Sequence, residues 1–118
     1  VITMDYLTRA TEMMAERRGI TKFMVFSDDL PWCIEQFADL PYEFLYSTAH
    51  SEIEDMELMS GCEHNIISNS TFGWWGAWFN RNNDKVVISP SKDNWFGPGN
   101  AHLDTSDIIP ESWIQIKY

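Results

Sequence analysis

The sequence predicts an α/β fold, in which helices flank a parallel sheet in the manner of a Rossmann-like half-domain. Short apolar segments rich in β-forming residues alternate with segments whose apolar residues recur at helical spacing. Most of the strand-like segments end in Asp, Asn, Ser or Pro residues, which typically begin loops or cap helices. Residues 1–118 are treated as a single domain, because no repeat, linker or low-complexity stretch interrupts them.

The first part of the chain predicts a helix, a strand and a second helix. Apolar residues recur at helical spacing from the start of the chain, and Gly19 is a natural helix end. Residues 22–27 (KFMVFS) form a short apolar run, which predicts a buried strand. Asp28 and Asp29 follow this strand, and Pro31 then lies where we expect the first turn of a helix capped by an aspartate.

The same alternation continues through the rest of the chain. A loop rich in Gly, Pro and Asn is expected between the last two strand-like segments, and the final segment is either a strand or a docked tail. The predicted strands are residues 42–47, 64–68, 85–89 and 112–117; the predicted helices are 53–62 and 71–80; the loop is 91–107.

Composition limits the partners and the chemistry. The formal charge of −10 argues against nucleic acid or an anionic membrane surface as a partner. Apolar runs are far shorter than the ~20 residues that span a bilayer. Cys33 and Cys62 form no CxxC pair and are interpreted as reduced thiols. Cys62 and His64 lack a second ligand pair at suitable spacing, so no metal site is expected.

Polar residues follow three of the predicted strands, namely Asp28 and Asp29, then residues 69–71, then Ser89 and Pro90. In a parallel sheet the carboxyl ends of the strands share one edge, and ligands bind there. The sequence therefore predicts a pocket on this edge, formed by the three polar clusters.

The segment SNSTFGWWGAW (68–78) begins a helix with hydroxyls and amides. The free N–H groups and partial positive charge of a helix N-terminus can hold a phosphate without any lysine. Ser70 and Thr71 are also ordinary N-cap residues, and residues 69–71 also match a glycosylation sequon, although a glycan there would block the predicted pocket.

The aromatic residues of this helix occupy more than one face, with Phe72, Trp75 and Phe79 on one and Trp74 and Trp78 on another. A helix that is apolar on several faces is expected to be buried. We therefore predict that these aromatic residues pack in the core, where the small residues Gly73, Gly76 and Ala77 let neighbouring elements approach closely.

The acidic residues admit several roles. Asp28 and Asp29 suit a metal ion, hydrogen bonds from a sugar or base, or a helix cap. Asp55 suits the first turn of a helix, where the dipole favours a carboxylate. A phosphoacceptor receiver domain also begins with an acidic pair after a strand. It is excluded because its later Asp and its Lys-Pro pair have no counterpart here.

Three segments together carry a resemblance to a known family, from about Tyr6 to Phe96. FMVFSDDLPWC (23–33), DMELMSGCEHNIISNSTFGWWGAWFN (55–80) and KVVISPSKDNWF (85–96) closely resemble the carboxyl-terminal part of α-1,2-fucosyltransferases, glycosyltransferase family eleven. The resemblance implies a GT-B enzyme of which this chain, residues 1–118, is a fragment carrying the Rossmann-like GDP-fucose-binding half.

The resemblance also implies roles for individual residues. Asp55 matches an acidic residue that hydrogen-bonds guanine, and Ser70 and Thr71, with the adjacent Asn69, match the segment that meets the diphosphate. Asp28 and Asp29 match an acidic pair that shapes the donor pocket. No catalytic base is implied by these residues, and neither a metal nor another cofactor is expected.

The implied reaction is the transfer of L-fucose from GDP-fucose to the 2-hydroxyl of a terminal β-galactoside, with inversion. The family's basic motif, His-x-Arg-Arg-x-Asp, and its acceptor-binding half have no counterpart in these residues. We therefore expect the amino-terminal half of the enzyme to be missing here, and the chain alone to be inactive. The parent protein is expected at a membrane, in the Golgi if animal or at the cytoplasmic face if bacterial. A non-catalytic module that binds guanine nucleotide or glycan is the alternative.

Overall fold

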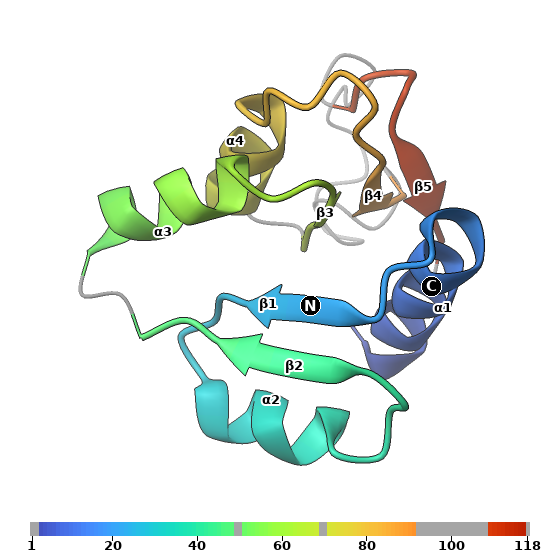
Figure 1. Ribbon diagram of the computed structural model, residues 1–118, viewed down its shortest axis with the longest axis vertical. Helices are drawn as coiled ribbons and strands as arrows, with labels where there is room; N and C mark the ends of the chain where they lie inside the picture. The colour runs from blue at the N-terminus through green and yellow to red at the C-terminus, as the bar shows by residue number, and fades with distance from the viewer. Residues whose placement is uncertain (1–2, 49–50, 69–70, 92–108, 118) are drawn as a thin grey trace, which may run out of the picture.

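The computed structural model describes residues 3–48, 51–68, 71–91 and 109–117. Of Thr71 it describes the backbone and not the side chain. Helices and strands alternate along the first 90 residues, as the sequence predicts (Figure 1). The final segment, for which a strand and a docked tail were both open, is a strand. The elements are α1 (Met4–Arg18), β1 (Lys22–Val25), α2 (Leu30–Phe37), β2 (Glu43–Tyr46), α3 (Glu52–Ser60), β3 (Asn65–Ile66), α4 (Thr71–Trp78), β4 (Val87–Pro90) and β5 (Ile114–Ile116).

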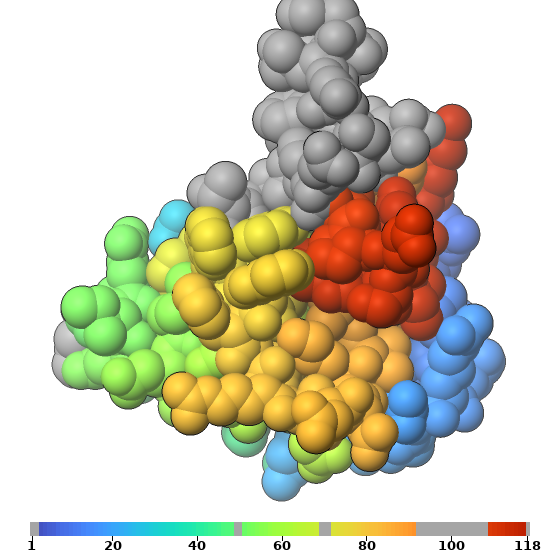
Figure 2. Space-filling view, turned by 90° about the horizontal axis from the view of Figure 1, so that it is seen from above, coloured from blue at the N-terminus to red at the C-terminus, as the bar shows by residue number. Residues whose placement is uncertain are grey.

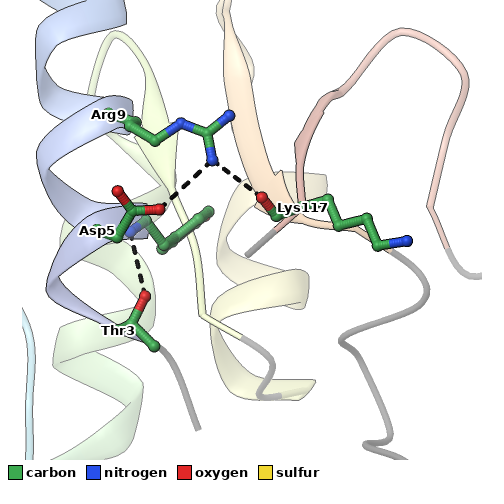
Figure 3. Close-up of polar contacts among 5 residues, drawn as sticks. Thr3, Asp5, Arg9 and Lys117 are labelled. Carbon is green, nitrogen blue, oxygen red and sulfur yellow. Dashed lines mark hydrogen bonds and ion pairs between the residues drawn. The ribbon is translucent and has the colours of Figure 1, made fainter.

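The first helices begin and end at the residues that the sequence marks. Thr3 caps α1, accepting a hydrogen bond from the amide of Tyr6 at 3.3 Å (Figure 3). Gly19 ends α1 in the left-handed conformation, with φ of 66°, which glycine adopts without steric cost. Asp29 caps α2 by accepting a hydrogen bond from the amide of Trp32 at 3.2 Å.

The described strands form two parallel sheets, whereas the sequence predicted one. In the first sheet β1 pairs with β2, and Val25 lies opposite Tyr46. In the second sheet β4 lies between β3 and β5, so that Ile88 pairs with Ile66 on one side and Ile114 on the other. The prediction of a continuous sheet is wrong for this chain, because no backbone ladder joins β1 to β3 among the described strands.

Helix α1 packs on the second sheet and forms one of two core clusters. Tyr6, Ala10 and Met14 are buried against Ile88 of β4 and Ile116 of β5. The side chain of Tyr6 is fully buried, and a buried hydroxyl needs a polar partner. Its partners are the backbone carbonyl oxygens of Ile67, directly after β3, and of Ile88, within β4.

The second core cluster lies beneath α4. Ala77 of the helix is buried against Ile67, Val87, Ile109 and Trp113, and Trp74 packs against this group. Helix α4 also packs on α3, where Gly76 faces Met59 so closely that an added Cβ would lie 2.9 Å from the Met59 Cε atom. The prediction that Gly76 and Ala77 allow close approach is therefore confirmed.

The prediction that the aromatic residues of the segment 71–80 are core residues is wrong for three of them. The side chains of Trp75, Trp78 and Phe79 are 45%, 51% and 54% exposed. Figure 2 shows the yellow side chains of α4 at the surface of the molecule. The inward face is made of small residues, because Gly73, Gly76 and Ala77 are buried while the large rings stack on one another outside.

Candidate functional site

Asp55 lies beside the carboxyl end of β2, held by a side chain from the neighbouring loop. Ser47 directly follows the last residue of β2, and its hydroxyl donates a hydrogen bond to Asp55 Oδ1 at 2.8 Å. Asp55 is in the first turn of α3, which Ser51 caps. The hydrogen bond fixes the orientation of a half-buried carboxylate whose oxygens have further acceptor capacity, since each carries two lone pairs.

Asp28 and Asp29 follow β1, the neighbour of β2, so they share the edge of the sheet that carries Asp55. Asp29 acts as the N-cap of α2, one of the roles the sequence left open, and its own amide donates to Ser27 Oγ at 3.0 Å. Asp28 is exposed to solvent. Asp28, Asp29 and Asp55 thus all lie on the side of the first sheet where its strands end.

The start of α4 follows β3 in the second sheet. Thr71 is the first residue of the helix, as predicted. Asn69, Ser70 and the side chain of Thr71 lie outside the described residues, so their contact with a phosphate stays a prediction. The N-terminus of α4 nevertheless carries the positive end of the helix dipole at the end of a parallel strand, which favours an anion there.

Ser89 and Pro90 do not lie on a rim as predicted. Both are within β4, and both are buried. The Ser89 hydroxyl has no hydrogen-bond partner among the described residues. The prediction failed because β4 is central in its sheet, so the strand continues to Pro90, whose partner on β5 is Ile116.

The predicted site residues therefore fall into two groups. Asp28, Asp29 and Asp55 lie at the end of the β1–β2 sheet, and Thr71 lies at the end of β3 in the other sheet. Within each sheet the strands are parallel, which puts their ends on one edge as expected. The two edges belong to separate sheets in this chain.

Sequence reasoning missed a buried amide pair that fixes the position of α4. The Asn80 side-chain amide donates to Asn65 Oδ1 at 2.7 Å and to the carbonyl oxygen of Cys62 at 2.8 Å. Asn65 in turn donates to the Met59 carbonyl oxygen at 2.9 Å. These bonds connect the end of α4, the start of β3 and the end of α3, and no sequence pattern distinguishes them from ordinary loop asparagines.

A lysine complements the other end of α4. The Lys85 Nζ atom donates to the Ala77 carbonyl oxygen at 2.9 Å and to the Asn80 carbonyl oxygen at 3.0 Å. A cation at a helix C-terminus is stabilised by the helix dipole and satisfies carbonyl groups that have no partner within the helix. Lys85 therefore stabilises α4 from the end opposite the candidate phosphate position.

Among the described residues, the cysteines and His64 do not form a metal centre. Cys33 and Cys62 are free thiols, as predicted, and burial raises the pKa of the Cys62 thiol. His64 Nδ1 accepts a hydrogen bond from the amide of Val86 at 2.8 Å. Across the described ranges no three His, Cys, Asp or Glu side chains come together as metal ligands would.

Comparison with known proteins identifies the family. The profile of "Glycosyl transferase family 11" matches residues 1–117. The chain belongs to this family. The resemblance seen in the sequence is thereby confirmed, and the family's curated members are glycosyltransferases.

Three relatives illustrate the range of the family. The chain is 40% identical to the O-antigen biosynthesis glycosyltransferase WbnK of Escherichia coli, over 98% of its own length and 37% of the relative's. It is 31% identical to an alpha-1,2-colitosyltransferase of Escherichia coli, over 98% of its length and 39% of the relative's. It is 28% identical to the galactoside 2-alpha-L-fucosyltransferase SEC1 of Bos taurus, over 62% of its length and 21% of the relative's.

The chain thus spans about two fifths of the two bacterial relatives. No solved structure matches it at a significant level. Within the described residues, none of the helices has both the length and the apolar character needed to cross a bilayer.

Proposed function

We propose that residues 1–118 form the donor-nucleotide domain of an α-1,2-glycosyltransferase of GT-B architecture, and that the donor is GDP-fucose. The longer polypeptide to which this domain would belong is called the parent protein below. Membership in glycosyl transferase family 11 supports the reaction type. The names of the colitosyltransferase and the galactoside fucosyltransferase both specify an α-1,2 linkage.

The observation that carries the nucleotide assignment is the placement of Asp55. Its carboxylate lies at the carboxyl edge of a parallel sheet, where such sheets bind nucleotides, and Ser47 orients it. Guanine offers N1–H and N2–H₂ as two parallel donors, which a carboxylate accepts together, whereas adenine offers no such pair. Asp55 in this proposal therefore selects GDP over ADP.

The diphosphate in this proposal meets the start of α4. Backbone N–H groups there, with Asn69, Ser70 and Thr71, would donate hydrogen bonds to phosphate oxygens. Asp28 and Asp29 would shape the pocket and could accept hydrogen bonds from sugar hydroxyls. Since the chain carries a formal charge of −10, we assign the positive charge that balances the diphosphate to the missing amino-terminal half.

The reaction we propose is a single displacement. The 2-hydroxyl oxygen of a terminal galactose forms a bond to the anomeric carbon of fucose, and the bond from that carbon to the β-phosphate oxygen breaks. GDP leaves with the electron pair, the configuration inverts, and the hydroxyl proton passes to a base that lies outside the residues assigned here. No metal or other cofactor takes part in this proposal, and we place the parent protein at a membrane.

A second candidate concerns the sugar. The relative named as a colitosyltransferase matches 98% of this chain, whereas the bovine fucosyltransferase matches 62%. That difference favours testing colitose beside fucose as the transferred sugar. A non-catalytic module that binds guanine nucleotide or glycan stands as the alternative to both transferases.

The test is a transfer assay with the parent protein, a β-galactoside acceptor, and GDP-fucose or GDP-colitose as donor. Asp55→Asn keeps the size of the side chain but replaces one oxygen acceptor with a donor, so we expect the donor KM to rise about 10- to 100-fold. Glu52→Gln removes the same charge from the same helical turn and should leave the donor KM unchanged. Transfer from neither donor, in a folded parent protein, would contradict the proposed reaction.

A further inference from the structure

The backbone of β1 is paired on one side only. The amides of Glu43 and Ser47 donate to the carbonyl oxygens of Thr21 and Val25, at 2.9 Å each. In a strand the N–H and C=O groups of successive residues point to opposite sides. The backbone groups of Met24 therefore point away from β2, at an edge of β1 that no described strand covers.

The backbone of β3 is likewise paired on one side only, with β4. The amides of Asn65 and Ile67 donate to the carbonyl oxygens of Val86 and Ile88, at 3.1 and 2.9 Å. The backbone groups of Ile66 accordingly point away from β4. Each sheet thus ends in a strand whose second edge is unpaired among the described strands.

The unpaired edges of β1 and β3 border the same pocket. Its volume is about 290 Å³, and side chains from α1, β1, β2 and the α3–β3 segment form its walls. Met24 and Leu45, which line it, are 41% and 44% exposed. Edge strands normally carry charges, bulges or prolines that block further pairing. In β1 the charge is confined to Lys22 at its start, and the remaining residues, Phe23 to Val25, are apolar, as is typical of an interior strand.

The direction of α1 indicates where a missing strand would connect. Tyr6, near the start of the helix, contacts the carbonyl oxygen of Ile67, directly after the carboxyl end of β3, and that of Ile88 within β4. Arg9 reaches the carbonyl oxygen of Lys117 at 2.9 Å, just beyond β5 (Figure 3). Helix α1 then runs back to Gly19 and leads into β1. A strand that feeds α1 would therefore end at this carboxyl edge and run parallel to β1.

We propose that a further β-strand, from the segment of the parent protein that directly precedes α1, lies between β1 and β3 and joins the two sheets into one. The chain spans only 37% of its relative WbnK, which leaves ample polypeptide to supply it. A strand, α1 and β1 would then form a right-handed crossover unit. The joined sheet would have the order β2-β1-new strand-β3-β4-β5.

This order is that of the classic doubly wound dinucleotide-binding sheet, numbered 3-2-1-4-5-6 with the new strand first. Its crevice lies where the chain reverses direction across the sheet, here between the new strand and β3. The new strand would thus bring the edge that carries Asp28 and Asp55 into line with the start of α4. The inference rests on backbone pairing and does not depend on the identity of the donor.

The test is amide hydrogen exchange of the parent protein, measured residue by residue by NMR. We expect the amides of Met24 and Ile66 to exchange at least about 100-fold more slowly than the same amides in an unstructured peptide. The amides of Ser47 and Ile67 already have partners and serve as matched controls. We also expect nuclear Overhauser contacts from Met24 to a residue that precedes Val1.

Three results would overturn the proposal. Met24 and Ile66 amides that exchange rapidly in the parent protein would show that the gap stays unpaired. Direct contacts between the backbones of β1 and β3 would show that the sheets join without an added strand. Contacts that arise only between labelled and unlabelled molecules in a mixed sample would assign the gap to a second copy of the protein.

Discussion

Ser47 and Asp55 are joined by a 2.8 Å hydrogen bond across the edge of the first sheet. The bond connects the residue after β2 to the first turn of α3, so the carboxylate is oriented by the strand as well as by its own helix. A protein side chain that is already held by two elements loses less conformational freedom when a ligand binds, and this favours selective recognition. The proposed guanine site depends on this pair.

Removal of the Ser47 hydroxyl should weaken GDP binding without abolishing it. Ser47→Ala leaves the Asp55 carboxylate in place but removes a hydrogen bond that orients it, so we expect about a 2- to 10-fold higher Kd for GDP. Isothermal titration of the parent protein measures this. Ser60→Ala is the control, because Ser60 bonds only to a backbone carbonyl at the far end of the same helix among the described contacts. Equal effects from the two variants would contradict a specific role for Ser47.

Tyr6→Phe should destabilise the fold. The buried hydroxyl contacts the carbonyl oxygens of Ile67 and Ile88, and its loss leaves buried acceptors without that partner. We expect the free energy of unfolding to fall by about 1–3 kcal/mol in denaturant titrations. Tyr42→Phe keeps the ring contacts of Tyr42 with Phe23 and should change stability far less. A Tyr6→Phe variant as stable as the original protein would show that these contacts contribute nothing.

Gly76→Ala should strain the contact between α3 and α4. The new Cβ would lie 2.9 Å from Met59 Cε and 3.1 Å from Met59 Cβ, so the end of the Met59 side chain must turn away and its Cβ must move by a few tenths of an ångström. We expect a loss of about 1–3 kcal/mol in the free energy of unfolding. Met59→Ala should relieve part of that loss in the double variant, as a double-mutant cycle measures. Strictly additive effects would contradict the direct contact.

His64 should make the fold less stable in mild acid. Burial is the largest effect on the pKa of His64 and lowers it; the nearby Arg18 lowers it further, and Glu63 acts in the opposite direction. Protonation of Nδ1 would also break the hydrogen bond that this atom accepts from the amide of Val86. A base whose pKa is lowered in the folded state contributes stability that is fully present above its unfolded pKa of about 6.5 and is lost as the pH falls below it. Unfolding titrations between pH 7.5 and 5.5 should therefore show a smaller decline for His64→Gln. An identical decline would exclude this histidine as a cause.

The sequence predicted the end of α1, the start of α2 and the order of the elements along the chain, because these depend on local chemistry. Gly19 and Asp29 act where their own backbone geometry and hydrogen bonds require them. Asp55 was also placed correctly, since a first-turn acid after a parallel strand must lie near the carboxyl edge. Such features need no knowledge of distant parts of the chain.

The features that sequence reasoning missed depend on neighbours. Helix α4 has large and small apolar residues on different faces, and only its packing on Met59 decides that the face with Gly76 is buried while Trp78 is exposed. Ser89 is buried because β5, distant in sequence, covers the other side of β4. The division into two sheets likewise depends on which strand lies beside β1. The sequence of these residues does not determine that neighbour.

The central claim is that this chain recognises guanine through Asp55. The most direct measurement is an NMR titration of the parent protein with GDP and, separately, ADP. We predict that GDP shifts the amides of Ser47, Asp55 and Gly73 more strongly than ADP does, and that Asp55→Asn removes this preference while Glu52→Gln retains it. Equal responses to GDP and ADP, or a preference that survives Asp55→Asn, would contradict the account.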